Sequence, residues 1–302
     1  MLVPNFFLAG APKCGTTSLS EYLRTHPNVF MCYPKEPIFF DEDLAQIHAV
    51  GSFDDYLALF RKRRDHHLAV GEASTCYLYS RNAMKRIHSF NRHAKIIVMF
   101  RNPVDFLPSL HAELLFDFNE DRKDFTEAWS LQEERARGRS VPKQCLVPQF
   151  LQYRALASFG DQLERLLAVF PRDQVMCILF DDLVTDPRAV YLDVLAFLGV
   201  PEDGRTAFPR YNEAKTHRWE RMGAFMMRPP PLVRASWRAL KRVCGPKISR
   251  FTASLILANA QPIDRTVLPE SFRNQLIDEF RPDIAKLSRL MGRDLSFWTR
   301  EP

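Results

Sequence analysis

The stretch VPNFFLAGAPKCGTTSLSEYL, residues 3–23, decides the fold class of this 302-residue chain. A run of apolar residues meets two glycines, Gly10 and Gly15, and three consecutive hydroxyl residues, and a helical pattern then begins. A buried strand followed by a glycine-containing turn and a helix is the outline of a phosphate-binding loop. The triphosphate-binding version has its lysine directly after the second glycine. Here that position is Thr16, and the lysine is Lys13, inside the loop.

The loop has the features of a site for a tetrahedral oxyanion. Its glycines let the backbone turn tightly and approach a ligand, and the helix that follows directs free N–H groups and its positive dipole end into the loop. A glycine turn capped by a threonine would explain the glycines and one hydroxyl, but not the lysine and three hydroxyls. The residues expected to contact the anion are Lys13, Cys14, Gly15, Thr16, Thr17 and Ser18.

Short apolar runs alternate with helical patterns along the rest of the chain. Buried strands are predicted at residues 3–9, 68–70, 95–100 and 174–180. Between the last two, leucines and Phe170 recur at helical spacing, and a helix is predicted from Pro187 to about Leu198, with Gly199 as its stop. This alternation indicates an α/β fold with a mostly parallel sheet flanked by helices, whose ligands bind at the carboxyl ends of the strands.

Composition narrows the class of protein. A hydrophobic content of 46% over 302 residues is enough for one domain spanning residues 1–302. The net charge of +6 favours acidic partners. The six cysteines are far apart and no histidine cluster accompanies them, which indicates reduced thiols, no metal site and a cytoplasmic protein. No run approaches the ~20 apolar residues of a membrane span.

The segment PKCGTTSL, residues 12–19, resembles the 5′-phosphosulfate loop of sulfotransferases that use 3′-phosphoadenosine 5′-phosphosulfate (PAPS). In that family, an arginine that ends a strand and a serine eight residues later bind the 3′-phosphate, and Arg101 and Ser109 in RNPVDFLPS have that spacing. The resemblance implies a P-loop-like three-layer fold, PAPS as co-substrate, the desulfated nucleotide PAP as product, and no metal.

A third segment, PKEPIFFDED, resembles the K-E-x-x-F-F-D segment of the glycosaminoglycan-type sulfotransferases, in which the glutamate is the catalytic base. This resemblance implies that Glu36 is the base and that Lys35 contacts the substrate. Glu36 is flanked by Lys35 and Pro37 in a stretch that cannot continue as a helix. The other interpretation of Lys35 and Glu36 is a pair of exposed loop charges.

Two departures from the family pattern bear on the acceptor. The segment GEASTCYL resembles a family stretch that often carries a lysine after the glutamate and a proline further on, but here these positions are Ala73 and Thr75. The glycosaminoglycan enzymes often have a histidine two residues after the base, and here that position is Ile38. Both changes weaken the prediction of a heparan-like acceptor. Glu72 is expected either to contact the acceptor or to have a structural role.

Two late segments, YNEAKTHR and LMGRDLSFW, resemble those of bacterial members of the same group. The first implies that a segment late in the chain folds over the nucleotide, with Lys215, which would also assist catalysis, Thr216 and Arg218 at its phosphates. Residues 205–250 are therefore predicted to form a basic lid or acceptor-covering segment, without regular structure around Lys215. A solvated turn is the alternative.

Two other classes of protein stay open at this stage. A P-loop kinase or hydrolase would use Asp181 or Asp182, at the end of the apolar run in VMCILFDDL, to hold Mg²⁺, although Asp182 or Thr185 can equally cap a helix. A module that binds membrane surfaces or nucleic acid is suggested by residues 205–250, which have twelve Lys or Arg against two acids. The second class leaves the anion-site motifs unexplained, but peripheral membrane contact stays open as an accessory property.

The sequence therefore predicts a PAPS-dependent sulfotransferase that acts on an acceptor hydroxyl and has no nucleic-acid partner. Carbohydrate, glycolipid and small natural product are all open as acceptors, anionic or lipid-linked ones included, and amine acceptors are also open.

Overall fold

The computed structural model of the protein describes residues 3–211, 215–227, 233, 254–255, 258–262 and 267–300. The chain divides into two compact units. The first consists of Met1–Phe106, Arg154–Asn212 and Pro269–Pro302, and the second of Leu107–Tyr153 and Glu213–Leu268.

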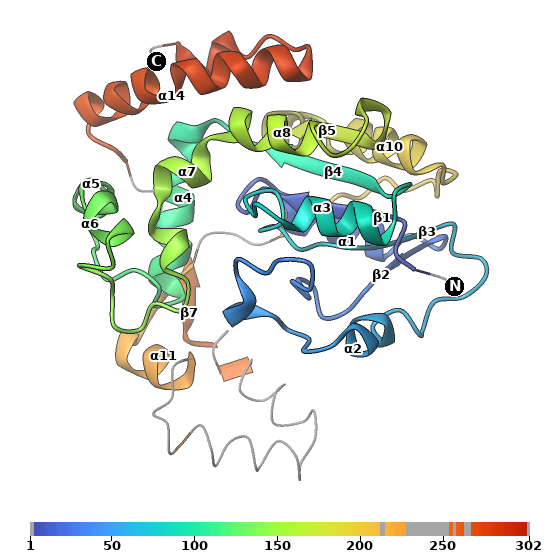
Figure 1. Cartoon of the computed structure of the whole chain (residues 1–302), viewed down its shortest axis with the longest axis horizontal. Helices are drawn as coiled ribbons and strands as arrows, with labels where there is room; N and C mark the ends of the chain where they lie inside the picture. Colours follow the sequence, from blue (N-terminus) through green and yellow to red (C-terminus); the bar gives the residue numbers. More distant parts are fainter. Residues whose placement is uncertain are drawn as a thin grey trace. The chain divides into compact units, whose positions relative to one another are not determined.

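The first unit contains a five-stranded, all-parallel sheet in the order β2-β3-β1-β4-β5 (Figure 1). The strands are β1 (Phe6–Gly10), β2 (Val29–Met31), β3 (Ala69–Glu72), β4 (Lys95–Phe100) and β5 (Val175–Leu179). From the central β1 the chain moves to one side for β2 and β3 and to the other for β4 and β5. This reversal places a ligand-binding switch point at the carboxyl end of β1.

The predicted α/β class is confirmed, and so are the four predicted strands, apart from shifts at their ends. All five residues of β1 and five of the six in β4 are buried, which explains their continuous apolar runs. The three-residue edge strand β2 was not predicted.

Helices connect and cover these strands. In the first unit they are α1 (Thr16–Arg24), α2 (Phe53–Ala58), α3 (Ala83–Phe90), α8 (Phe159–Leu167), α9 (Phe180–Thr185), α10 (Pro187–Leu198) and α14 (Glu270–Met291), with short 3₁₀ turns at Ala45–Ile47, Arg172–Gln174 and Ser296–Thr299. Two helices, α4 (Pro103–Phe116) and α7 (Tyr153–Ala157), include residues of both units. The predicted helix from Pro187 is confirmed. Asp186 caps its start by accepting from the Ala189 N–H at 2.9 Å, and Gly199 ends it with a φ of 75°.

The C-terminal helix α14 runs alongside α8 (Figure 1). The Asp283 carboxylate of α14 accepts from the N–H groups of Gly160 and Asp161, at 2.8 and 3.0 Å, in the first turn of α8. A Cβ at Gly160 would lie 2.6 Å from the Asp283 carbonyl oxygen, so the close packing of these helices requires glycine.

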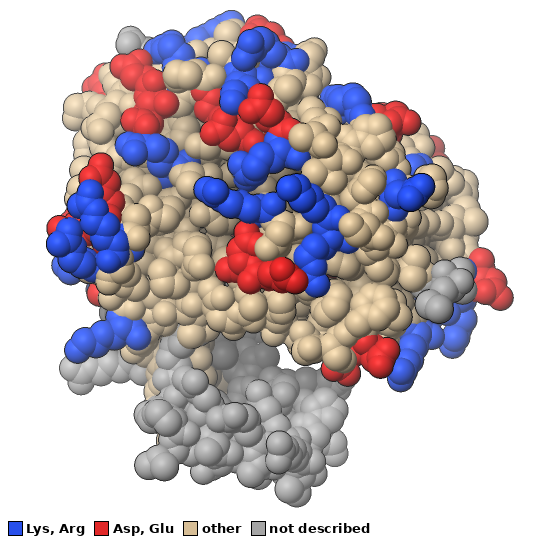
Figure 2. All heavy atoms as spheres, viewed as in Figure 1, with Lys and Arg blue, Asp and Glu red and all other residues tan. Residues whose placement is uncertain are grey.

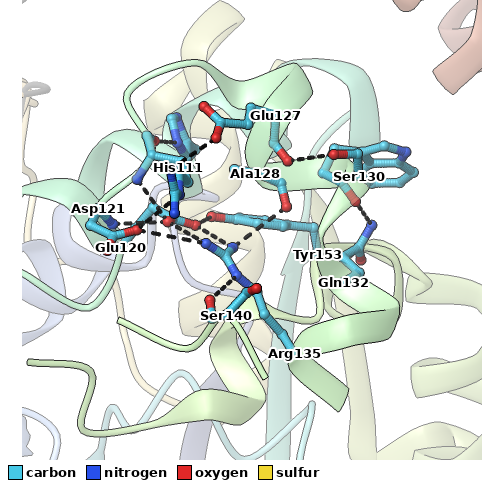
Figure 3. Close-up of polar contacts among 12 residues, drawn as sticks. His111, Glu120, Asp121, Glu127, Ala128, Ser130, Gln132, Arg135, Ser140 and Tyr153 are labelled. Carbon is cyan, nitrogen blue, oxygen red and sulfur yellow. Dashed lines mark hydrogen bonds and ion pairs between the residues drawn. The ribbon is translucent and has the colours of Figure 1, made fainter. Parts of the chain in front are cut away.

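The described part of the second unit contains α5 (Phe125–Ser130), α6 (Gln132–Ala136), a 3₁₀ turn at Pro148–Leu151, α11 (Glu220–Met227), and the antiparallel strands β6 (Lys215–His217) and β7 (Ala260–Pro262). Figure 3 shows its buried polar cluster. Both nitrogens of the Arg135 fork donate to Glu120, at 2.6 and 2.7 Å, and neither side chain is exposed to solvent. The Tyr153 hydroxyl donates to the same carboxylate at 2.7 Å.

The polar groups of this cluster have several hydrogen-bond partners each. The Glu120 carboxylate also accepts from the N–H groups of Asp121 and Arg122, and Arg135 donates to the carbonyls of Ala128 and Ser140. Burial alone would raise the pKa of Glu120, but the hydrogen bonds from Arg135, the Arg122 N–H and Tyr153, together with the charge of Arg135, outweigh it and hold the pKa below its usual value. The side chains of Glu120 and Arg135 are therefore both charged, and their ion pair links α6 to the segment that follows α4.

Basic and acidic side chains are interspersed on the face shown in Figure 2, so the net positive charge does not form a single field there. The five described cysteines are free thiols, and Cys244 lies outside the described residues. Within the described ranges, no helix has the length and apolarity needed to cross a membrane.

Replacing Arg135 with Met should destabilise the protein by ~3–5 kcal/mol, because Glu120 would be left as an uncompensated buried charge. Arg137→Met is the matched control, since Arg137 is 64% exposed and its partner Glu133 lies 3.7 Å away, and it should change stability by less than ~0.5 kcal/mol. Urea denaturation of both variants measures the difference. Equal losses would show that the buried pair is no more important than an exposed one.

Candidate active site

The loop between β1 and α1 requires glycine at two positions. Gly10 and Gly15 have φ values of 156° and 88°. A Cβ at Gly15 would lie 2.6 Å from Leu183 Cδ2, and one at Gly10 would lie 2.6 Å from Leu78 Cβ and 2.9 Å from the Thr75 carbonyl oxygen. The loop is therefore packed closely on the segment after β3 and on α9.

The helix that follows presents an open N-terminus to this loop. Gly15 is its N-cap and offers no side-chain acceptor, and the first turn contains no acidic residue. Its first N–H groups and positive dipole end are thus available to an anion. Thr16 and Ser18 are buried and Thr17 is half-buried. The Ser18 hydroxyl oxygen accepts from the Tyr211 N–H at 3.3 Å, and the same hydroxyl also hydrogen-bonds the side chain of Tyr22.

Cys14 differs from its neighbours because its side chain is fully buried. Burial raises the pKa of the thiol far above its ordinary value, although the charges of Arg101 and Lys13 act in the opposite direction. The thiol is therefore a protonated, space-filling group. Of this residue, the backbone is what can contact an anion.

Arg101 supports the loop from the neighbouring strand. It directly follows β4, is 8% exposed, and donates from Nη1 to the Lys13 carbonyl at 3.4 Å. Its guanidinium carbon lies 4.8 Å from the centre of the Phe180 ring, within the range of a cation–π contact. The structure thus brings together Lys13 and Arg101, which are 88 residues apart in the sequence.

Glu36 lies beyond β2, at the carboxyl-end edge of the same sheet. Its Oε1 accepts from Lys35 Nζ at 2.6 Å and from Thr75 Oγ1 at 3.3 Å, and its side chain is 36% exposed. Glu36 and Ile38 have φ values of 60° and 50°, a left-handed conformation that costs roughly 1–2 kcal/mol per residue. Such strain persists only where surrounding contacts enforce it.

Glu72, the last residue of β3, is fully buried. Its carboxylate accepts from Tyr56 at 2.9 Å, from Tyr77 at 3.1 Å and from Ser74 at 2.6 Å. Burial raises the pKa of Glu72 to about 7, the three hydroxyl hydrogen bonds lower it, and the charge of Glu36 raises it further. Of the two roles expected for Glu72, this environment favours the structural one over direct contact with an acceptor.

The other predicted nucleotide contacts lie in the second unit. Ser109 is on α4, and Arg218 follows β6. The expectation that Lys215 lies in irregular structure is wrong, because Lys215–His217 form β6, in which Thr216 pairs with Gln261 of β7. A partner 45 residues later in the chain could not be recognised from YNEAKTHR alone. Much of the predicted basic segment 205–250 lies outside the described residues.

His217 anchors β6 within the second unit. Its ring stacks on Phe116 at 4.2 Å and on Phe118 at 5.0 Å, and its Nε2 hydrogen-bonds the Phe116 carbonyl at 2.9 Å. Gly223 makes room for it, since a Cβ there would lie 2.6 Å from His217 Nδ1.

The two candidate Mg²⁺-binding aspartates are engaged with the segment LMGRDLSFW. Asp181 accepts from Trp298 Nε1 at 3.2 Å, and both carboxylate oxygens of Asp182 pair with Arg293. In the described part of the chain, no group of three or more His, Cys, Asp or Glu side chains could hold a metal ion. These contacts favour a structural role for both aspartates.

Sequence reasoning missed two residues of this site. Thr75 was noted only as a departure from a family pattern, yet it contacts both the loop and Glu36. Phe180 lies under Arg101 and against the position of Gly15. The hydroxyl-rich composition of GEASTCYL was the available signal for Thr75. No sequence signal identifies Phe180 as part of the site.

Comparison with known proteins agrees with this geometry. Residues 3–216 match the family described as sulfotransferase domain. The chain belongs to the sulfotransferase family. A sulfotransferase from Alicyclobacillus acidocaldarius has a similar structure, with a TM-score of 0.71, 30% sequence identity, and coverage of 99% of this chain and 100% of that one.

Curated relatives are more distant and longer. The chain is 26% identical to bifunctional heparan sulfate N-deacetylase/N-sulfotransferase 3 of Homo sapiens, over 99% of this chain and 31% of that protein. It is also 26% identical to carbohydrate sulfotransferase 15 of Mus musculus, over 66% of this chain and 44% of the relative. It thus spans less than half the length of either relative.

Gly15→Ala should lower the melting temperature and weaken binding of PAP by ~10-fold or more, because the new Cβ would displace the loop from α9. Gly199→Ala is the matched control, since Gly199 also has a positive φ, of 75°, but no atom lies within 4 Å of its Cβ position. Calorimetric titration with PAP and thermal unfolding give the two readouts. Equal PAP affinity in the two variants would contradict a nucleotide-binding role for this loop.

Proposed function

We propose that this sulfotransferase moves a sulfuryl group from PAPS to a hydroxyl of its acceptor, with Glu36 as the general base. One observation carries the proposal. Thr75 joins the loop of residues 10–18, here called the oxyanion loop, to the half-exposed Glu36. Its carbonyl packs against Gly10 of the loop, and its hydroxyl donates to Glu36. A site for the donor anion and a candidate base are therefore neighbours at one edge of the sheet.

Each group has a defined task in this reaction. The sulfur–oxygen bond to the leaving phosphate breaks while a bond from sulfur to the acceptor oxygen forms, and the acceptor proton passes to Glu36. Negative charge grows on the leaving phosphate, where Lys13 and the N–H groups of α1 stabilise it. Proton removal by a positioned carboxylate typically contributes ~10²–10⁴ in rate. Lys35 pairs with Glu36 and would hold the base, and the family resemblance implies that it contacts the acceptor.

The remaining nucleotide contacts follow from the family resemblance. Arg101 and Ser109 would hold the 3′-phosphate, and the late segment with Lys215, Thr216 and Arg218 would add donors at the phosphates, with Lys215 assisting catalysis. The buried position of Arg101 beside Lys13 supports a phosphate contact at the end of β4. A cytoplasmic location and peripheral membrane contact through residues 205–250 stay predictions.

A carbohydrate is the favoured acceptor class. Several proteins of similar sequence are named for heparan sulfate or carbohydrate substrates. Glycolipids and small natural products stay open, because Ala73 and Ile38 replace two residues of the glycosaminoglycan-type pattern.

Glu36→Gln should lower kcat by ~10² or more with little change in PAPS affinity, because a base acts on the acceptor proton in the transition state. Lys13→Ala should lower kcat by a similar ~10², through loss of charge stabilisation on the leaving group. Glu42→Gln is the matched control: Glu42 is 65% exposed and pairs with Arg86, so turnover should change less than about twofold. Full turnover by Glu36→Gln would remove Glu36 as the base.

The wild-type protein should prefer PAPS over adenosine 5′-phosphosulfate by about 10- to 100-fold, since losing a charge-assisted phosphate contact costs ~1.5–3 kcal/mol. Arg101→Ala should remove most of this preference. The ratio of kcat/KM values for the two donors is the appropriate measure, because Arg101 also supports the Lys13 carbonyl and its loss would lower activity with both. An unchanged ratio in the variant would contradict the 3′-phosphate assignment.

A further inference from the structure

Two hydroxyl groups connect the buried Glu72 to the segment that carries Glu36. Ser74 donates to Glu72 and accepts from the Ile38 N–H at 3.0 Å. Tyr77 also donates to Glu72 and accepts from the N–H groups of Phe39 and Phe40, at 2.9 and 3.2 Å. Three consecutive backbone N–H groups, beginning two residues after Glu36, are thus held by hydroxyls bound to one carboxylate.

The carboxylate sets the direction of these hydrogen bonds. An ionised carboxylate accepts only, so each hydroxyl proton must point toward Glu72. The hydroxyl lone pairs then face the backbone N–H groups of residues 38–40. These hydrogen bonds are external contacts that hold the left-handed residue Ile38 and the two residues after it.

We propose that Glu72 is a positioning residue that, through Ser74 and Tyr77, clamps residues 38–40 and thereby holds Glu36 beside the oxyanion loop. Its effect on turnover rests on the proposed role of Glu36 as the base. The clamp itself is independent of that role and has its own readout.

Tyr56 provides an internal control. Its hydroxyl donates to the same Glu72 oxygen as Tyr77 does, and both tyrosines are fully buried. The three N–H groups donate to Ser74 and Tyr77, not to Tyr56. Removing either phenolic hydroxyl takes one hydrogen bond from Glu72, but only the change at Tyr77 breaks the connection to the clamped segment.

The clamp should depend on pH near neutrality. The titratable groups around Glu72 are Glu36, Tyr56 of α2, Tyr77 and Cys76 after β3, and Cys32 after β2. Burial raises the pKa of both tyrosines and both thiols, so these groups are neutral, while burial and the charge of Glu36 raise the pKa of Glu72 to about 7. Below this pH the protonated carboxyl has one fewer accepting oxygen, and the clamp should loosen.

The free energy of unfolding should change with pH in the opposite direction: it should fall as the pH rises. The pKa of Glu72 in the folded protein lies above its ordinary value of 4.5, so the contribution of Glu72 to stability is fully present below pH 4.5 and is lost as the pH rises through about 7. In Glu72→Gln both pH dependences should disappear. A buried carboxyl that clamps nothing would show the dependence of stability alone, because that dependence follows from its raised pKa.

The test compares Glu72→Gln, Ser74→Ala and Tyr77→Phe with Tyr56→Phe. Hydrogen exchange of the amides of residues 38–40, measured at pH 8, should be ~10-fold faster in the first three variants and unchanged in Tyr56→Phe. The same three variants should have kcat lowered ~10-fold, with KM for PAPS within about twofold of wild type, because a displaced base affects chemistry rather than donor binding. Ser74→Ala removes a single hydroxyl and keeps the test available if Glu72→Gln does not fold.

Three outcomes would overturn the proposal. Unchanged exchange in Ser74→Ala and Tyr77→Phe would show that no clamp exists. Equal effects of Tyr56→Phe and Tyr77→Phe on both readouts would reduce Glu72 to a buried packing group. Faster exchange with unchanged kcat would show that the clamp does not position the base, and the Glu36→Gln measurement separately decides whether Glu36 is the base at all.

Discussion

At Gly10 the backbone of the oxyanion loop approaches the segment after β3 so closely that a Cβ there would lie 2.9 Å from the Thr75 carbonyl oxygen. This contact requires glycine, and it fixes Thr75 between the loop and Glu36. A larger residue would separate the anion site from the candidate base. The proximity that the proposed sulfuryl transfer requires therefore rests on the missing side chain of Gly10.

The proposed donor-binding cations and the two glutamates follow different strands at the carboxyl-end edge of the parallel sheet. Lys13 follows β1 and Arg101 follows β4, whereas Glu36 and Glu72 follow or end β2 and β3, on the other side of β1. In the proposed mechanism, Lys13 and Arg101 hold the donor anion, and Glu36 removes the acceptor proton. The two carboxylates differ because burial and the charge of Glu36 raise the pKa of Glu72, whereas Glu36 remains half-exposed.

Buried polar clusters organise both units. In the first unit, the Glu72 carboxylate accepts hydrogen bonds from three neutral hydroxyls and, among the described residues, is not paired with a cation, and its pKa lies near neutrality. In the second, Glu120 has a bidentate arginine, and its pKa lies below the usual value. The difference follows from the partner: a fixed cation stabilises the charged carboxylate at all physiological pH values, whereas hydroxyls leave it able to titrate. Glu120 therefore suits a permanent structural contact, and Glu72 a pH-dependent one.

The sequence by itself determined the oxyanion loop, four strands of the sheet, and the helix from Pro187 to Leu198. Apolar runs, glycines and capping residues act on near neighbours in the chain, so their patterns can be recognised locally. Only the tertiary structure decided that Glu72 lies buried, that Thr75 bridges the loop and Glu36, that Asp181 and Asp182 bind the C-terminal segment, and that Lys215–His217 form a strand. The partner of a buried polar group or an isolated strand lies far away in the chain, and long-range packing alone selects it.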